Sequence, residues 1–191
     1  MDEREREIRA ATVGDLPRHD ATIELAEYDE GWPRLFEREA ARIRRALGDR
    51  VLLLEHAGST SVPGLAAKRR IDIALGVADS SHEDDYIPAL EAVGYVVRIR
   101  EPDWHEHRML RGPDTEVNLH VFSDGSPEIE RMLRFRDHLR SHPDDRELYE
   151  QTKRALATRE WRFVQDYADA KSEVVEAILG RASVDPNEQA R

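Results

Sequence analysis

The sequence has no cysteine and no long apolar run. The absence of cysteine excludes disulfide bonds and thiolate zinc sites, and it is compatible with a reducing cytosol. No apolar stretch approaches the length of a membrane span, and the N-terminus carries no apolar signal segment. We therefore expect a cytoplasmic protein that does not insert into a membrane.

Basic residues are outnumbered, with 29 lysines and arginines against 40 aspartates and glutamates, and the net charge is −11. Such a surface repels the phosphate backbone of nucleic acids, so general DNA or RNA binding is not expected. A few clustered cations can still control the potential of a single cleft. The composition is therefore compatible with a pocket for a nucleotide.

No stretch rich in glycine, serine or proline divides the interior of the chain, and 191 residues are typical of one domain. We assign residues 21–182 to this domain. Residues 1–20 are charged and aperiodic, and residues 183–191 are short, polar and interrupted by Pro186. Both ends are predicted to be poorly ordered tails.

Apolar residues recur at helical spacing in some segments and alternate with polar ones in others. Helices are predicted over 32–47, over 83–93, from 126, after 143 and from about 160, and strands over 51–54, 71–77, 95–97, 107–110 and 117–122. The turn Gly112-Pro113-Asp114 is expected to join the last two strands as a hairpin. This order predicts an α+β fold, a small mixed β-sheet flanked by helices with a helical C-terminal portion.

Two of these strands carry polar side chains on one face. In the strand 71–77 the apolar residues alternate with Asp72 and two small residues, so Asp72 is the one charged group on its face. In the strand 117–122 Asn118 and His120 share the face opposite the apolar residues. Asp72, Asn118 and His120 are therefore candidate functional residues.

The segment 55–72 has the chemistry of an anion site. Gly58 permits a close backbone approach, hydroxyl donors follow it, and cations stand at the far end of the loop. These donors and cations are Ser59, Thr60, Ser61, Lys68, Arg69 and Arg70. A carboxylate such as Asp72 beside a phosphate suits Mg²⁺, which bridges phosphate oxygens and one or two carboxylates. The alternative is a flexible turn in which Lys68 and Arg69 are solvated.

Several stretches of the sequence resemble the GrpB family. The segment EHAGSTSVPGLAAKRRIDI of this chain is similar to the signature of the family. The segment YDEGWPRLFEREAARI is similar to the opening helix of the family, and NLHVF is similar to its central strand. The helical end of the family is similar to RFRDHLRSHPDDRELYEQTKRAL and YADAKSEVVEAIL. The likeness covers roughly residues 23–181. It implies a place in the nucleotidyltransferase superfamily, and in some bacteria a related domain is fused to dephospho-coenzyme A kinase.

The resemblance implies roles for individual positions. The pair Gly58-Ser59 matches the phosphate-holding Gly-Ser of the superfamily, and Asp72 matches its first metal-binding aspartate. A nucleoside triphosphate, a divalent metal (Mg or Mn) and nucleotidyl transfer to a small acceptor are thereby implied, while the acceptor and the oligomeric state stay undetermined. In this hypothesis Lys68 and Arg108 neutralise charge, and His120 orients the metal or the acceptor.

The second acid of the superfamily is missing, because Ala74 occupies the position two residues after Asp72. A two-metal site is then incomplete unless another group supplies a ligand. The candidates for this ligand are Glu55, Glu116, His56 and His120, and a histidine would suit a softer divalent metal than Mg²⁺. Ala74 also favours a second hypothesis, a catalytically degenerate nucleotide-binding or scaffolding module.

The candidate residues also have structural interpretations. The strand aspartate can accept backbone hydrogen bonds from the loop, and His56 and His120 can be hydrogen-bonded core histidines. Arg108 can reach the phosphates or pair at the surface with a neighbouring acid, Glu106 or Asp103. The sequence leaves these alternatives open.

Overall fold

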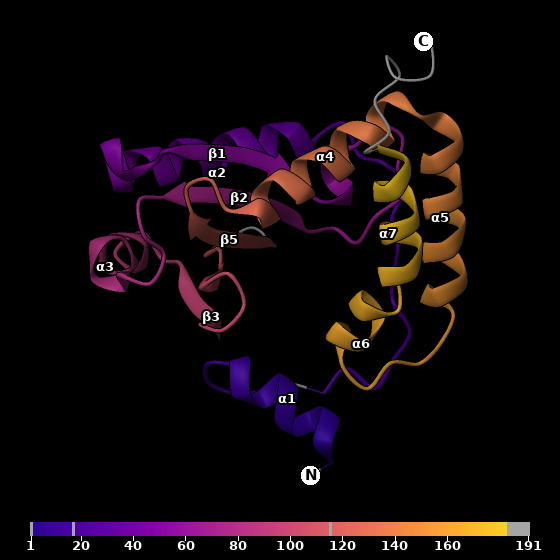
Figure 1. The fold of residues 1–191 in the computed structure, drawn as a ribbon, viewed down its shortest axis with the longest axis horizontal. Helices are drawn as coiled ribbons and strands as arrows, with labels where there is room; N and C mark the ends of the chain where they lie inside the picture. Colours follow the sequence, from indigo (N-terminus) through magenta and orange to yellow (C-terminus); the bar gives the residue numbers. More distant parts are fainter. Residues whose placement is uncertain (1, 17, 115, 183–191) are drawn as a thin grey trace.

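The computed structural model describes residues 2–16, 18–114 and 116–182, in which helices surround a mixed sheet (Figure 1). Its helices are α1 (Glu3–Ala11), α2 (Trp32–Leu47), α3 (Ile87–Glu91), α4 (Pro127–Ser141), α5 (Pro143–Ala157), α6 (Val164–Asp169) and α7 (Ser172–Ala182). Its strands are β1 (Leu53–Ala57), β2 (Ile71–Val77), β3 (Val96–Glu101), β4 (His107–Arg111) and β5 (Val117–Ser123). Short 3₁₀ turns lie at Gly48–Arg50, Ser59–Ser61 and Glu83–Asp85.

The five-stranded sheet has the order β1-β2-β5-β4-β3. β2 and β5 run parallel, whereas the other neighbouring strands run antiparallel, so the sheet is mixed. β4 and β5 pair as the predicted hairpin. The α+β class that the element order predicts is confirmed, and the β2–β5 pair lies at the centre of the sheet.

One face of the sheet is apolar, as the alternation in β2 predicts. The side chains of Ile71, Ile73 and Leu75 are at most 1% exposed. α2 and α3 cover this face with buried side chains that include Ile43 and Leu90. Burial of apolar surface stabilises the fold by about 25 cal/mol per Å². The apolar cluster therefore holds the strands together, and the opposite face of the sheet can carry polar groups.

Several helix ends lie where the sequence predicts them. α2 has Pro33 in its first turn and ends at Gly48, whose φ of 57° suits glycine. The hydroxyl of Ser126 accepts a hydrogen bond from the backbone N–H of Glu128 and thereby caps α4. Within residues 2–16, 18–114 and 116–182, no helix is both long and apolar enough to cross a membrane.

Several predicted elements have different bounds in the structure, and three of these differences affect the site or the packing. β1 begins at Leu53 rather than at 51, because its extent follows its pairing with β2 and not its own apolar run. The shift places Glu55 and His56 within the strand, on opposite faces. The helix predicted over 83–93 is a 3₁₀ turn followed by the short α3. The helix predicted from about 160 is divided into α6 and α7, and the turn between them lets α7 pack against α4.

The structure corrects the prediction of a poorly ordered tail over residues 1–20, because this segment contains α1. Arg4 of α1 forms an ion pair with Asp166 of α6 at 2.8 Å, and Arg162 bonds two acidic side chains at the start of α1. These partners are far away in the sequence, so local periodicity does not reveal the contact. The other predicted tail, 183–191, lies outside the described residues.

Ile73→Ala is expected to lower the free energy of unfolding by about 2–5 kcal/mol, because it leaves a cavity at a fully buried position. Urea denaturation followed by circular dichroism measures the change. Leu52→Ala is the matched control, since this side chain is 52% exposed and a surface substitution stays within about 0.5 kcal/mol. Equal losses in the two variants would contradict the location of the core.

Candidate functional site

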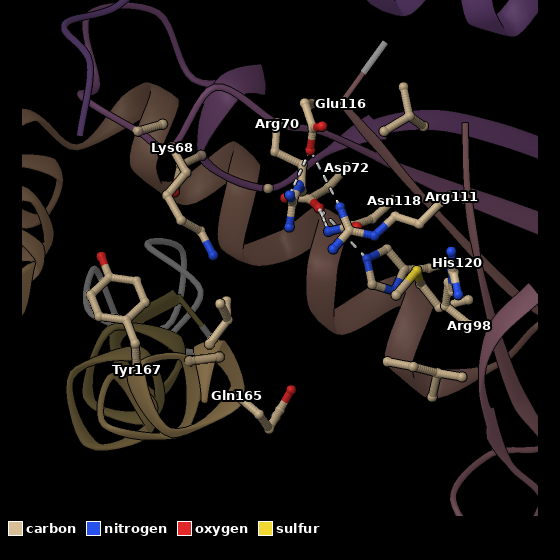
Figure 2. A pocket seen from close by; sticks show the side chains of 18 of the residues that line it. Lys68, Arg70, Asp72, Arg98, Arg111, Glu116, Asn118, His120, Gln165 and Tyr167 are labelled. Atoms are coloured by element: carbon tan, nitrogen blue, oxygen red, sulfur yellow. Dashed lines mark hydrogen bonds and ion pairs between the residues drawn. The ribbon is translucent and has the colours of Figure 1, made fainter. Parts of the chain in front are cut away.

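A cavity of about 860 Å³ lies on the polar face of the sheet. β2, β4 and β5 contribute to it, as do the loop after β1 and α6 (Figure 2). A smaller cavity of about 220 Å³ shares Gly58, Ser59 and Asp72 with the larger one and extends toward α4. The larger cavity brings together nine of the residues that the sequence singled out, namely Gly58, Ser59, Thr60, Lys68, Arg70, Asp72, Glu116, Asn118 and His120.

Gly58 and Asp72 lie against each other where β1 ends. Gly58 has a φ of 66° and a ψ of −174°, a conformation adopted almost only by glycine. A Cβ atom at this position would stand 2.3 Å from Oδ2 of Asp72. Ser59 follows at the start of a 3₁₀ turn and lines both cavities. The glycine therefore makes room for the carboxylate beside the serine.

Two side chains of β5 stabilise the charge of Asp72. β2 and β5 pair with Asp72 beside Asn118 and with Ala74 beside His120. Nδ2 of Asn118 donates a 2.7 Å hydrogen bond to Oδ1 of Asp72, and Nε2 of His120 lies 3.7 Å from the same oxygen. Burial opposes ionisation, but these two side chains and the charge of Lys68 hold the pKa of Asp72 below its usual value. An anionic carboxylate therefore faces the cavity at neutral pH.

His120 is connected to two further polar side chains. Its Nδ1 lies 3.0 Å from Nε2 of His107, and Nδ1 of His107 lies 2.7 Å from Oε2 of Glu101. Burial lowers the pKa of His107, although the carboxylate of Glu101 opposes this effect. No sequence pattern indicated this connection, because it depends on the pairing of β3 with β4, which places Glu101 opposite His107.

Two arginines lie near Asp72 in the cavity (Figure 2). Arg70 donates a 2.6 Å hydrogen bond to Oε2 of Glu116, and Nη1 of Arg111 lies 3.5 Å from the same oxygen. Burial is the main reason that the pKa of Arg111 is lowered, and the charge of Arg70 adds to it. Glu116 is thus the partner of two arginines, which retain further donors for an anion.

Three lysines form another wall of the cavity. Nζ of Lys68 lies 5.4 Å, and Nζ of Lys171 4.8 Å, from the ring centroid of Tyr167. Lys153 is 2% exposed and donates a hydrogen bond to the carbonyl of Ala66. Burial, followed by the charge of Lys171, lowers the pKa of Lys68 to about 8 and that of Lys153 to about 7. In the part of the chain that the structure describes, none of the three forms an ion pair.

Arg108 does not reach the cavity. Alternation in β4 puts Arg111 on the polar face and Arg108 on the apolar face, opposite Val121. There, Nε of Arg108 donates to Glu83, and its Nη1 donates to the carbonyl of Glu106 at 3.0 Å. The predicted contact of Arg108 with phosphates is therefore wrong, and Arg111 has the position that was expected for it.

The two candidates from β1 have structural partners. Glu55 forms a 2.8 Å ion pair with Arg136 of α4 and lines neither cavity. His56 stacks on Phe36 with a centroid distance of 4.9 Å, and its Nε2 lies 3.1 Å from Oγ1 of Thr60. Burial lowers the pKa of His56 to about 4, so it is neutral. The interpretation of His56 as a hydrogen-bonded core histidine is confirmed. The role of Glu55 as a metal ligand stays a prediction, and in this structure Arg136 is its partner.

For two loop residues, the structure shows other surroundings than the phosphate contact that was expected of them. The hydroxyl of Thr60 donates to the carbonyl of Arg70 at 3.1 Å, and Arg69 is exposed and does not line the cavity. Arg111 was missed, although extending the predicted strand by one residue would have placed it beside the site. Lys153, Lys171 and Tyr167 were also missed. Lys153 lies on α5, Tyr167 on α6 and Lys171 in the turn after α6. All three are distant in sequence from the loop and strands of the site, so no local signal marks them.

The donors around Asp72 suit one divalent ion rather than two. Ala74, at the position where the sequence resemblance implied a second acid, is fully buried, and Glu55 and Glu116 are engaged by arginines. Over the described ranges, no three acidic or histidine side chains are grouped as metal ligands. An ion held by Asp72 and His120 would need water and substrate oxygens as its other ligands, which Mg²⁺ commonly takes.

The mixed sheet and its surrounding helices make this chain an α+β protein, and the glycine-serine bend against a strand aspartate is the centre of its candidate site. The family model described as GrpB protein matches residues 22–181, and the chain belongs to this family. It is 59% identical over 179 residues to a UPF0157 protein from Halalkalibacterium halodurans, and the match covers 94% of this chain and 92% of that protein. The family that the sequence stretches resemble is thereby confirmed.

A solved structure supports the same fold. The crystal structure of conserved protein GrpB from Enterococcus faecalis matches with a TM-score of 0.73 and 31% identity, covering 83% of this chain and 96% of that chain. The chain is also 29% identical over 177 residues to a dephospho-CoA kinase from Mycolicibacterium paratuberculosis, which covers 79% of this chain and 44% of that protein. The chain is therefore similar to a part of that kinase.

Gly58→Ala is expected to destabilise the protein by more than the roughly 1–2 kcal/mol that positive φ costs an alanine, because the new Cβ meets Asp72. Gly64→Ala is the matched control, since Gly64 has a φ of 77° and no atom within 4 Å of its added Cβ. Thermal denaturation of both variants measures the difference. If Gly58→Ala is no less stable than Gly64→Ala, the close packing of the bend against Asp72 is refuted.

Proposed function

We propose that the chain binds a nucleoside triphosphate together with one divalent ion, Mg²⁺ or Mn²⁺, and transfers a nucleotidyl group to a small acceptor. The contact between Gly58 and Asp72 inside a cationic cavity carries this proposal. A phosphate at the bend would lie beside a carboxylate, which is the arrangement that a metal ion bridges. Kinship with the nucleotidyltransferase superfamily, which the sequence signature implies, is part of the proposal.

The cations of the cavity favour a ligand with several negative charges. Lys68, Lys153 and Lys171 line the cavity. Arg70 and Arg111 lie near the carboxylate of Asp72 (Figure 2). Burial of an ammonium group without an anion is unfavourable, and a chain of phosphates along these cations would offset that cost. Because the net charge of the protein is −11, this positive potential is local and selects for anions that fit the cavity.

The residues at the bend have separate tasks in this proposal. The backbone N–H groups and the hydroxyl of Ser59 bind phosphate oxygens, because successive amides of such a turn form an anion site. Asp72 and His120 would hold the metal ion, which would supply neutralisation of phosphate charge. Lys68 stabilises the negative charge that develops during transfer. Positioning and electrostatics account for most of the catalysis in reactions of this class.

A catalytically degenerate nucleotide-binding or scaffolding module is the second candidate. It is favoured by Ala74, which is fully buried where the superfamily has its second acid, so that two-metal catalysis lacks a ligand. The similarity to part of a dephospho-CoA kinase agrees with an accessory role of this kind. A cytoplasmic location is part of this proposal, since an enzyme or a binding module for nucleotides needs a nucleotide pool.

Addition of ATP, CTP, GTP or UTP with Mg²⁺ or Mn²⁺ is expected to raise the melting temperature of the parent protein. A ligand at 100 times its Kd stabilises the fold by about 2.7 kcal/mol. Asp72→Asn keeps the shape of the side chain and removes its charge, so the metal-dependent part of the stabilisation should be lost. Asp84→Asn, at an exposed position outside the cavity, is the control and should behave as the parent.

The same titration separates the candidates. If no nucleotide stabilises the parent in the presence of either metal, the enzyme and the nucleotide-binding module are refuted together, and of the second candidate only the scaffolding role remains. If a nucleotide does, release of pyrophosphate with a panel of small acceptors identifies the enzyme. Metal-dependent binding with no release across the panel identifies the binding module.

Affinity for the nucleotide is expected to fall by up to about tenfold between about pH 7.5 and 9. The reason is that Lys68, with a pKa near 8, is a cation below that pH and neutral above it, so its attraction for phosphate is lost as pH rises. Lys68→Arg remains charged over this range and should show a smaller decline. Isothermal titration at each pH measures the affinity, and an equal decline in both proteins would rule out Lys68 as the cause.

A further inference from the structure

Glu101, His107, His120 and Asp72 form a row of side chains from the edge of the sheet to the cavity. Oε2 of Glu101 lies 2.7 Å from Nδ1 of His107, and Nε2 of His107 lies 3.0 Å from Nδ1 of His120. The row ends at the cavity, where Nε2 of His120 faces Oδ1 of Asp72 across 3.7 Å. In each imidazole, therefore, one ring nitrogen faces the neighbour nearer the edge of the sheet, and the other faces the neighbour nearer the cavity.

The hydrogen bonds determine which nitrogens carry protons. A carboxylate accepts only, so Nδ1 of His107 donates to Glu101. The side chain of His107 is 5% exposed and stacks on Phe122 with a centroid distance of 4.7 Å, and such a site disfavours a second proton and its charge. Nε2 of His107 then accepts and Nδ1 of His120 donates, so that Nε2 of a neutral His120 keeps its lone pair.

The lone pair of His120 has no donor opposite it. Oδ1 of Asp72 is an acceptor as well, and it already receives a hydrogen bond from Nδ2 of Asn118 at 2.7 Å. The separation of 3.7 Å between Nε2 and Oδ1 is too long for a hydrogen bond. With His120 neutral, two electron-pair donors therefore face one another at the wall of the cavity. A proton on Nε2 would pair the imidazolium with the carboxylate, and a divalent cation that displaces this proton is the other species that both groups can bind.

We propose that Glu101 and His107 are positioning residues that hold His120 with its proton on Nδ1 and direct the Nε2 lone pair to a divalent cation shared with Asp72. Histidines that bind metals commonly donate their other ring N–H to a fixed acceptor, which sets the tautomer and the orientation of the ring. Here the acceptor is a second histidine, which Glu101 in turn orients. The inference rests on the proposed function, because it concerns the metal ion of that site.

The test is to measure the histidine tautomers by long-range ¹H–¹⁵N NMR in the full chain, without metal or nucleotide. For the parent, at a pH at which His120 is neutral, we expect its proton on Nδ1 and none on Nε2. His107→Phe keeps an aromatic ring against Phe122 and removes the acceptor, so His120 should move its proton to Nε2. Should the parent already carry the proton on Nε2, or should His107→Phe leave the tautomer unchanged, the inference is overturned.

Glu101→Gln provides a second variant that does not depend on the folding of His107→Phe. It should shift the signal of the Nδ1 proton of His107, because a charged acceptor is replaced by a neutral one. Glu106→Gln alters an exposed acid of the same β3–β4 connection and is the matched control, with no change expected. An unshifted signal in Glu101→Gln would remove Glu101 from the proposal.

Titration with Mn²⁺ alone gives the functional measurement. His107→Phe should bind Mn²⁺ about 10–100-fold more weakly than the parent, the usual effect of losing an outer partner of a metal ligand. Equal affinity in the two proteins would overturn the positioning role. A parent that binds no Mn²⁺ would overturn the metal ion in both proposals, whereas a parent that binds Mn²⁺ but no nucleotide would overturn only the proposed function.

Discussion

The parallel pairing of β2 with β5 is the constraint on which the candidate site depends. It puts Asp72 beside Asn118 and Ala74 beside His120, although the two strands are distant in sequence and no hairpin can join parallel strands. A slip of one residue would turn Asp72 toward the apolar core. The register is maintained on the other face of the sheet, where Ile71, Ile73 and Leu75 belong to the apolar cluster that also contains side chains of α2 and α3. Hydrophobic packing on one face thus holds the polar chemistry on the other.

The electrostatics of the cavity follow from how its cations are partnered. Arg108 and Arg136 lie outside the larger cavity and are engaged by acids, whereas Lys68 and Lys171 face the ring of Tyr167. A cation–π contact contributes about 0.5–2 kcal/mol, which does not replace the hydration of a buried ammonium group. The lowered pKa of Lys68 expresses this cost. An acidic protein can therefore contain a site that attracts anions.

Helices and strands whose bounds follow from the pattern of neighbouring side chains were predictable from the sequence. Those whose bounds depend on contacts with a distant segment were not. The apolar face of β2, the amphipathic α2 and the Ser126 cap of α4 follow from side chains near one another in sequence. The start of β1 depends on β2, and α1 is held by ion pairs with residues near α6. Such contacts join residues that no periodicity relates, so single-sequence reasoning misplaced the strand and took the helix for a tail.

For the site, the sequence by itself determined which groups were available: a glycine-serine bend, one acid on the polar face of β2, and an amide and an imidazole on the same face of β5. Only the tertiary structure decided which of them meet, bringing Asp72 to Gly58 and His120 while turning Arg108 away and tying Glu55 to Arg136. The physical reason is that alternation along a strand is a local property, whereas strand register and helix packing depend on contacts between distant segments.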